Sequence, residues 1–224
     1  MSGSRFETLL QQISREAGKG GMDIDVQVYR AAGRDPLWPV LLGSGALSSR
    51  LGIFGRDPGR TEAELGEPFI GKGGQLVRTE LYRRAGGKGT PSLEQSILAG
   101  RSVFWGNTVP FKPVGNKAWS VAVKRRFAPY IAAVLTECWT GTSLITLGNE
   151  AFFWFGLAEP ANKPALATFW QRPGRYRESI SVTLAGKPIT LYPLPHPSPL
   201  NATWYSRFPE MLAGRLDELG WQGG

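Results

Sequence analysis

Short β-forming runs alternate along this chain with longer helical patterns, and this alternation constrains the fold more than any other feature of the sequence. The β-rich runs are residues 50–55, 102–107, 143–148 and 189–194, and helical patterns occupy residues 73–84, 118–140 and 149–155. Strands that alternate with helices form mostly parallel sheets, because each crossover helix packs over a face of the sheet. The sequence predicts an α/β fold, a single domain with a short four-stranded, mostly parallel sheet between helices.

Two further helical patterns lie near the ends of the chain, at residues 4–17 and 207–220. A glycine-rich segment, residues 18–21, follows the first of them. We therefore expect residues 1–45 to form an N-terminal helical extension and linker, and residues 46–224 to form the α/β domain. With 224 residues, 42% of them hydrophobic, the chain can bury one full core.

The charge of the chain is basic, with 26 Lys and Arg against 18 Asp and Glu, a net charge of +8. Such an excess is typical of nucleic-acid-binding proteins, although contact with anionic membranes or ribosomes gives the same sum. No apolar run approaches the roughly 20 residues that span a bilayer, and no secretory pattern opens the chain. With a single cysteine, Cys138, we expect a soluble, cytoplasmic protein without disulfides, an iron–sulfur site or a zinc site.

Polar residues follow the ends of three predicted strands. They are Asp57, Asn107 and His196, the single histidine, which three prolines flank. Each has a simpler interpretation alone: a turn at Asp57, a backbone contact at Asn107 and a structural role for His196. Because the carboxyl ends of parallel strands share one edge of the sheet, the three together predict a pocket with an acid, an amide and an imidazole.

Residues 66–73, GEPFIGKG, come within one residue of the phosphate-binding loop of nucleotide hydrolases. In that loop a Ser or Thr that binds Mg²⁺ stands where this chain has Gly73, and the preceding predicted strand ends too early to enter the loop directly. We therefore predict neither a nucleotide cofactor nor a metal.

Taken together, these segments resemble the uracil-DNA glycosylase superfamily over about residues 50–210. The runs GRDPG at 55–59 and GEPFIGKGG at 66–74 are most similar to its thermophile-type branch, whereas HPSPL at 196–200 resembles the conventional enzyme. The thermophile-type branch carries cysteines for an iron–sulfur cluster. Because this chain has one cysteine, the resemblance implies a relative without that cofactor.

The resemblance implies a monofunctional DNA glycosylase that flips uracil, or another deaminated base, out of DNA and leaves an abasic site for base excision repair. Hydrolysis of the N-glycosidic bond needs a carboxylate that orients water and offsets positive charge on the sugar, a role we assign to Asp57. We expect His196 to donate to uracil O2 and to stabilise the departing base. The amide of Asn107 matches the edge of uracil and opposes that of cytosine.

The same resemblance gives four further residues contacts with DNA. Phe69 is expected to stack on the base, Leu200 to fill the gap left by the flipped nucleotide, and Ser198 and Lys112 to hold phosphates. Phe69 could equally be a core residue, and Lys112 a solvated charge. Since no lysine adjoins the strand-end motifs, we predict no lyase step, which requires a nucleophilic amine.

Two positions depart from the better-known branches. Gly59 stands where the conventional enzyme has a tyrosine that blocks the thymine methyl, and Arg56 stands where Gln or Glu is usual. We expect Gly55 and Arg56 to lie beside the base, and the more open, cationic pocket extends the expected substrates to xanthine and hypoxanthine.

A second function class stays open: a non-catalytic DNA-binding module that recognises deaminated or single-stranded DNA. A small-molecule hydrolase is disfavoured, because the chain lacks a Gly-x-Ser-x-Gly nucleophile motif. We expect a monomer whose partner is DNA, single- or double-stranded, with no membrane contact. Residues 156–183, rich in Pro, Arg and aromatics, are either an insertion that touches DNA or a surface loop.

Overall fold

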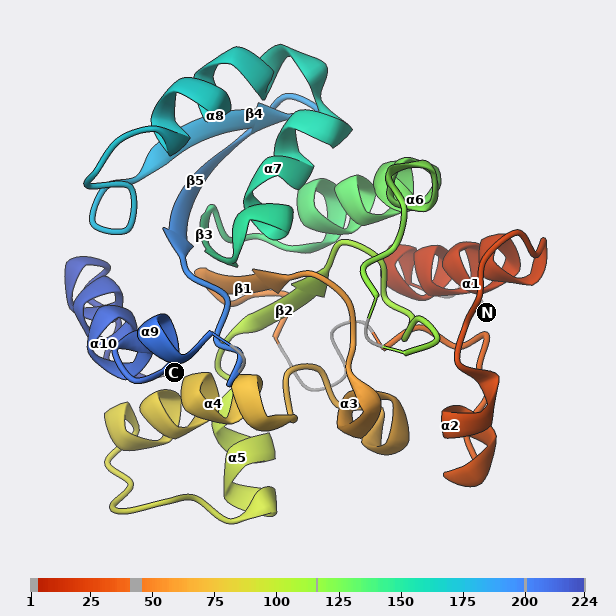
Figure 1. The fold of residues 1–224 in the computed structure, drawn as a ribbon, viewed down its shortest axis with the longest axis horizontal. Coiled ribbons are helices and arrows are strands. Elements are labelled where there is room, and N and C mark those ends of the chain that lie inside the picture. Colours follow the sequence, from red (N-terminus) through yellow and green to blue (C-terminus); the bar gives the residue numbers. More distant parts are fainter. Residues whose placement is uncertain (1–3, 41–45, 116, 200, 224) are drawn as a thin grey trace.

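The computed structural model describes residues 4–40, 46–115, 117–199 and 201–223 (Figure 1). Its strands are β1 Leu51–Gly55, β2 Phe104–Asn107, β3 Ser143–Leu147, β4 Ile180–Leu184 and β5 Lys187–Leu194. Its helices are α1 Arg5–Gly18, α2 Val26–Ala31, α3 Arg60–Leu65, α4 Lys72–Arg84, α5 Leu93–Gly100, α6 Val121–Ala133, α7 Asn149–Ala158, α8 Lys163–Trp170, α9 Ala202–Tyr205 and α10 Phe208–Glu218. A π-helical turn, Val134–Cys138, continues α6, and a 3₁₀ turn, Pro160–Asn162, precedes α8.

The strands form one sheet in the order β2-β1-β3-β5-β4, in which β4 alone is antiparallel. In the parallel register Gly55 lies opposite Asn107, and Leu147 lies opposite Leu194. Four strands therefore end at the same edge, as the crossover argument predicts. The predicted α/β fold with a mostly parallel sheet is confirmed, but the predicted number of four strands is wrong, because the sheet has five.

The additional strand, β4, forms a hairpin with β5. Its burial alternates, with Val182 and Leu184 inside and Ser181 and Thr183 outside, which is the pattern of an edge strand with one covered face. The two-residue turn, Ala185 and Gly186, has positive φ angles of 45° and 83°, as in the type I′ turns that suit hairpins. Part of the segment at 156–183 is therefore a helix and an edge strand.

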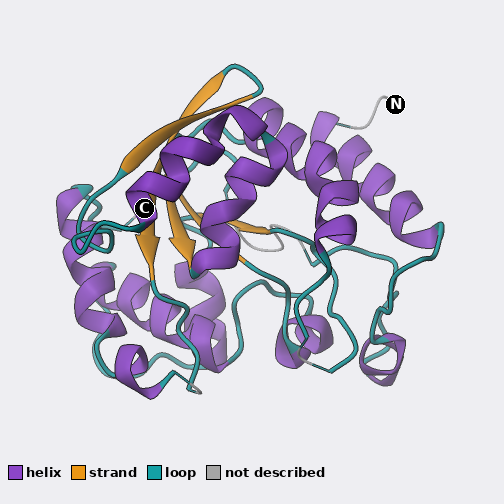
Figure 2. Ribbon diagram, turned by 45° about the horizontal axis from the view of Figure 1, so that its top comes forward, coloured by secondary structure: helices purple, strands orange, loops and turns teal. Residues whose placement is uncertain are grey.

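Helices cover both faces of the sheet (Figures 1 and 2). In Figure 1, α4, α5 and α10 lie on one side of the sheet, and α1, α6 and α7 lie on the other. Buried side chains of the strands, such as Ile53, Trp105 and Ile145, meet buried helix residues in one continuous core. The two helical layers hold the strands rigidly, so the loops after the strand ends are presented by a fixed scaffold.

Helix α1 packs directly onto the α/β core. Ser4 caps the helix and exchanges hydrogen bonds with Glu7 in a capping box, and Leu9 and Ile13 are buried in the same core as the strands. The domain boundary expected at residue 45 stays a prediction.

Candidate functional site

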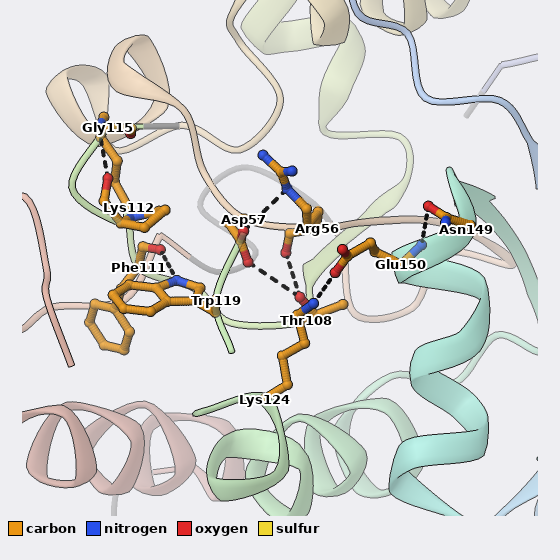
Figure 3. Close-up of polar contacts among 11 residues, drawn as sticks. Arg56, Asp57, Thr108, Phe111, Lys112, Gly115, Trp119, Lys124, Asn149 and Glu150 are labelled. Carbon is orange, nitrogen blue, oxygen red and sulfur yellow. Dashed lines mark hydrogen bonds and ion pairs between the residues drawn. The ribbon is translucent and has the colours of Figure 1, made fainter. Parts of the chain in front are cut away.

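The site lies at the edge of the sheet where β1, β2, β3 and β5 end, and Asp57 is its buried acid (Figure 3). Its carboxylate is 1% exposed, with Oδ2 3.2 Å from Arg56 Nε and Oδ1 3.4 Å from the hydroxyl of Thr108. The backbone N–H of Trp119 also donates to it. Thr108 in turn donates to the carbonyl of Arg56 at 2.9 Å, which ties the turn after β1 to the end of β2.

Burial raises the pKa of Asp57 to about 6, while Arg56 and Lys124 act in the opposite direction. The acid is therefore mostly ionised at pH 7 but has a far higher proton affinity than a solvated aspartate. Such a perturbed carboxyl group at the end of a strand is typical of catalytic acids and bases.

A lysine that the sequence motifs do not include lies beside this acid. Lys124, on α6, is buried and forms an ion pair with Glu150 at the start of α7 (Figure 3). Burial lowers the pKa of Lys124, and Asp57 opposes that shift. Because Lys124 lies 67 residues from Asp57 in a helix without a motif, only the packing of α6 against the strand ends reveals it.

Asn107 and Phe69 lie on the same side of β2. Asn107 is 3% exposed, and its Oδ1 has no hydrogen-bond partner among the described residues. Phe69 stacks on Trp105, with ring centroids 5.1 Å apart, and residues 105 and 107 share a face of the strand because side chains alternate. Gly55 lets the ring of Phe69 approach β1, since a Cβ there would lie 2.5 Å from the ring. The predicted base-stacking residue thus lies near the predicted base-reading residue.

Phe69 is held in an unusual backbone conformation by a buried arginine that sequence reasoning missed. Its φ angle is 52°, in the left-handed region that few side chains adopt. Arg78, fully buried on α4, donates to the carbonyls of Phe69 and Pro68 at 3.0 and 2.5 Å and to that of Ser96 at 2.6 Å. Two charge-assisted hydrogen bonds hold the loop and the third ties the same guanidinium to α5, so Arg78 positions the ring of Phe69.

His196 follows β5 and lies at the junction of three elements. It adjoins Gly148 at the end of β3, where a Cβ would be 3.0 Å from that of His196. The carbonyl of Pro197 touches Gly73 of α4 so closely that a side chain at residue 73 would overlap it. His196 is an exposed residue, yet desolvation of its ring by neighbouring protein atoms and the charge of Arg56 lower its pKa to about 4. His196 is therefore neutral at pH 7, with one N–H to donate.

Arg56 lies between the two proposed catalytic residues, Asp57 and His196. It pairs with the carboxylate of Asp57 and lies close enough to His196 to disfavour the imidazolium form. Gly59, the other departure from the better-known branches, is the N-cap of α3, and the carboxylate of Glu62 lies 2.6 Å from where its Cβ would be. Glu62 also accepts from the N–H of Gly71, so part of the space beside Gly59 is occupied.

The structure brings together Gly55, Arg56, Asp57, Phe69, Asn107 and His196, but not Lys112. The ammonium group of Lys112 is buried and donates to Asp25 at 2.7 Å and to the carbonyls of Pro113 and Gly115 at 2.9 Å. The expected phosphate contact is therefore corrected: Lys112 fastens its own loop to the N-terminal segment, because its three donors are all used there.

The two remaining predicted DNA contacts lie in the loop after His196. The backbone N–H of Ser198 donates to the carbonyl of His196 at 2.8 Å, in a tight turn beside the site. Leu200 lies outside the described residues. Roles for both residues stay predictions.

The described part of the chain contains no group of three or more His, Cys, Asp or Glu side chains arranged to hold a metal ion. An iron–sulfur cluster usually needs four thiolates, and the sequence has only Cys138, half-buried in the π-helical turn, so the residues present do not fit a cluster. Over the same part of the chain, no helix combines the length and apolar character needed to cross a membrane.

Comparison with known proteins gives a family and a relative to which the chain is similar. The family model described as the uracil DNA glycosylase superfamily matches residues 42–220. The type-4 uracil-DNA glycosylase of Thermotoga maritima is 43% identical over 116 residues, which are 52% of this chain and 54% of that protein. The match thus spans about half the length of this relative. All the described site residues lie within the range of the family match.

Proposed function

Because the chain belongs to the uracil DNA glycosylase superfamily, we propose that it hydrolyses the N-glycosidic bond of uracil in DNA and leaves an abasic site. The observation that carries this proposal is the buried amide of Asn107, whose Oδ1 lacks a partner among the described residues. An unpaired buried polar atom costs about 1–3 kcal/mol. Uracil N3–H would supply the missing donor, and the stacked ring of Phe69 lies on the same face of β2.

Asp57 and His196 supply the chemistry in this proposal. The C1′–N1 bond breaks with its electron pair going to the base, and the oxygen of water bonds to C1′. The carboxylate of Asp57 orients that water, accepts a proton from it and offsets positive charge on the sugar. Neutral His196 donates its N–H to uracil O2, where negative charge develops, and stabilises the leaving anion without giving up a full proton.

The range of bases forms a second part of the proposal. Arg56 places a cation beside both Asp57 and His196, and a cation at that point favours a base that leaves as an anion. We expect xanthine and hypoxanthine to be excised as well. The reaction needs water but no cofactor, and the lack of a lyase step stays part of the proposal, since Lys124 is paired with Glu150.

The test is base release from oligonucleotides with one uracil, single-stranded or paired with guanine or adenine, followed by alkali. Alkali-dependent cleavage that Asp57→Asn and His196→Ala abolish, while DNA binding persists, supports the glycosylase. Cleavage without alkali would contradict the monofunctional mechanism. Binding without cleavage of uracil, xanthine or hypoxanthine, unchanged in Asp57→Asn, would favour the non-catalytic DNA-binding module.

A further inference from the structure

A cavity of about 730 Å³ lies apart from the strand-end site, between helices α9 and α10 and the connection from α8 to β4. Its lining includes Tyr176, Arg177, Trp204, Arg207 and Arg215. Its volume is within the range of about 300–1,000 Å³ that is usual for small-molecule sites. Helix α9, which contributes Trp204 to the lining, begins six residues after His196 in sequence.

Aromatic rings from distant parts of the sequence meet at this cavity. Tyr176 and Trp204 are in edge contact, with ring centroids 5.1 Å apart, and Tyr176 also contacts Trp170 at 6.0 Å. Trp204 and Tyr176 are each only partly buried, although both line the cavity. Half-exposed aromatic rings around a hollow are surfaces on which bases of any sequence can stack.

The cavity is also cationic. Arg207 and Arg177 are exposed, and neither has a carboxylate within ion-pair distance among the described residues. Arg215 is 2% exposed, and its Nε has no hydrogen-bond partner in the same part of the chain. Of the two lining carboxylates, Glu218 is paired with Arg215 at 2.7 Å, which leaves Glu210 against the two exposed arginines. The net charge favours an anionic ligand.

We propose that this cavity binds an unpaired nucleotide of the DNA strand that flanks the excised base. The base stacks on Trp204, and Arg177 and Arg207 contact its phosphates, as in proteins that bind single-stranded nucleic acid. A base in a duplex cannot enter the cavity, so the protein prefers single-stranded DNA. This inference rests on the proposed action on DNA, and it gives the open segment at residues 156–183 a role in binding the strand.

The test measures affinity for a uracil-free single strand and for the matched duplex by fluorescence anisotropy. Trp204→Ala is expected to weaken single-strand binding about tenfold, as loss of one stacked base does, with a much smaller effect on the duplex. Arg177→Gln is expected to lower the slope of log affinity against log salt by about 0.7. The Arg177→Gln variant also tests the cavity if Trp204→Ala disturbs folding, because Arg177 is exposed.

Arg15→Gln is the matched control, since Arg15 is exposed on α1, at the opposite side of the fold from α9 and α10. The cavity proposal is overturned if both cavity variants bind the single strand as Arg15→Gln does, or if all three lose the same affinity. Strand binding that depends on Trp204 and Arg177, in a protein that releases no base, would sink the proposed glycosylase alone. A strand that is shortened beside the uracil lacks the flanking nucleotide. It should bind the wild-type protein more weakly than the full strand does, but it should bind Trp204→Ala about as tightly as the full strand does.

Discussion

Replacement of Arg56 by Gln should move the acid limb of the pH–rate profile to higher pH. The proposed mechanism needs the carboxylate of Asp57, whose pKa of about 6 is held down by Arg56. The rate of base release therefore rises with pH as Asp57 loses its proton. His196 adds no second limb near neutral pH, because its pKa of about 4 keeps it neutral throughout that range.

The size of the shift follows from the geometry. Charges 3.2 Å apart interact by about 1 kcal/mol in water and about 5 kcal/mol at an effective dielectric constant near 20. Arg56 is 31% exposed, so we take the lower end, about 1.4 kcal/mol, or a tenfold higher proton affinity in the variant. The pKa of Asp57 then becomes about 7, and the ionised fraction falls about eightfold at pH 5.5 but only about twofold at pH 7.

The assay is single-turnover release of uracil at saturating DNA between pH 4.5 and 8.5. Arg56 also lies beside the proposed base site, so its replacement can change the plateau rate for other reasons. The test is therefore the pH at the midpoint of the acid limb. Arg56→Lys keeps the charge and should leave the midpoint nearly unchanged. An Arg56→Gln midpoint that stays in place or moves to lower pH would refute this reasoning.

Three further predictions concern stability. Burial raises the pKa of Asp57 from 3.8 to about 6. The stability of the wild-type fold therefore falls as pH rises between those values, because ionisation of this carboxyl group opposes folding. Asp57→Asn should stabilise the fold by up to about 3 kcal/mol at pH 8. Thermal unfolding should show this gain vanish near pH 4; an equal gain at both pH values would contradict it. Lys112→Met should cost about 1–3 kcal/mol of stability, because partly buried Asp25 and two carbonyls lose their donor, yet leave the salt dependence of DNA affinity unchanged; a reduced salt slope would restore the phosphate contact. Arg78→Met should cost about 3–5 kcal/mol in urea unfolding, since three buried carbonyls lose their donor, whereas exposed Arg83→Met on the same helix should cost little; similar losses would show that those hydrogen bonds contribute nothing.

The edge strand β4 shows why part of the fold escaped sequence reasoning. Ser181, Val182, Thr183 and Leu184 alternate as a half-buried strand does, but five residues give a weak signal among the Arg, Pro and aromatic residues before them. The turn at Ala185 and Gly186 was the stronger clue, because Gly tolerates the positive φ of a hairpin turn. The long parallel crossovers had far clearer patterns, since each joins an apolar strand to a longer helical segment.

Lys112 and Lys124 were misjudged for a different reason. Sequence position placed Lys112 beside Asn107 and left Lys124 apart from every motif. In the structure Lys112 donates to Asp25 and two carbonyls, whereas Lys124 pairs with Glu150 beside Asp57. Which charges face a site depends on partners far away in the chain, and local patterns carry no information about those partners.

By itself, the sequence determined the α/β fold and the mostly parallel arrangement of its strands. Hydrophobic periodicity and the stiff turns after the strands are local properties, so Asp57, Asn107 and His196 could be assigned to one edge from the order of the elements alone. Only the tertiary structure decided how these groups ionise and what holds them. Desolvation, opposed by the charges of Arg56 and Lys124, sets the pKa of Asp57, and desolvation together with the charge of Arg56 sets the pKa of His196. Arg78 fixes Phe69. Desolvation and Coulomb interactions depend on distances in space that the linear order of residues does not contain.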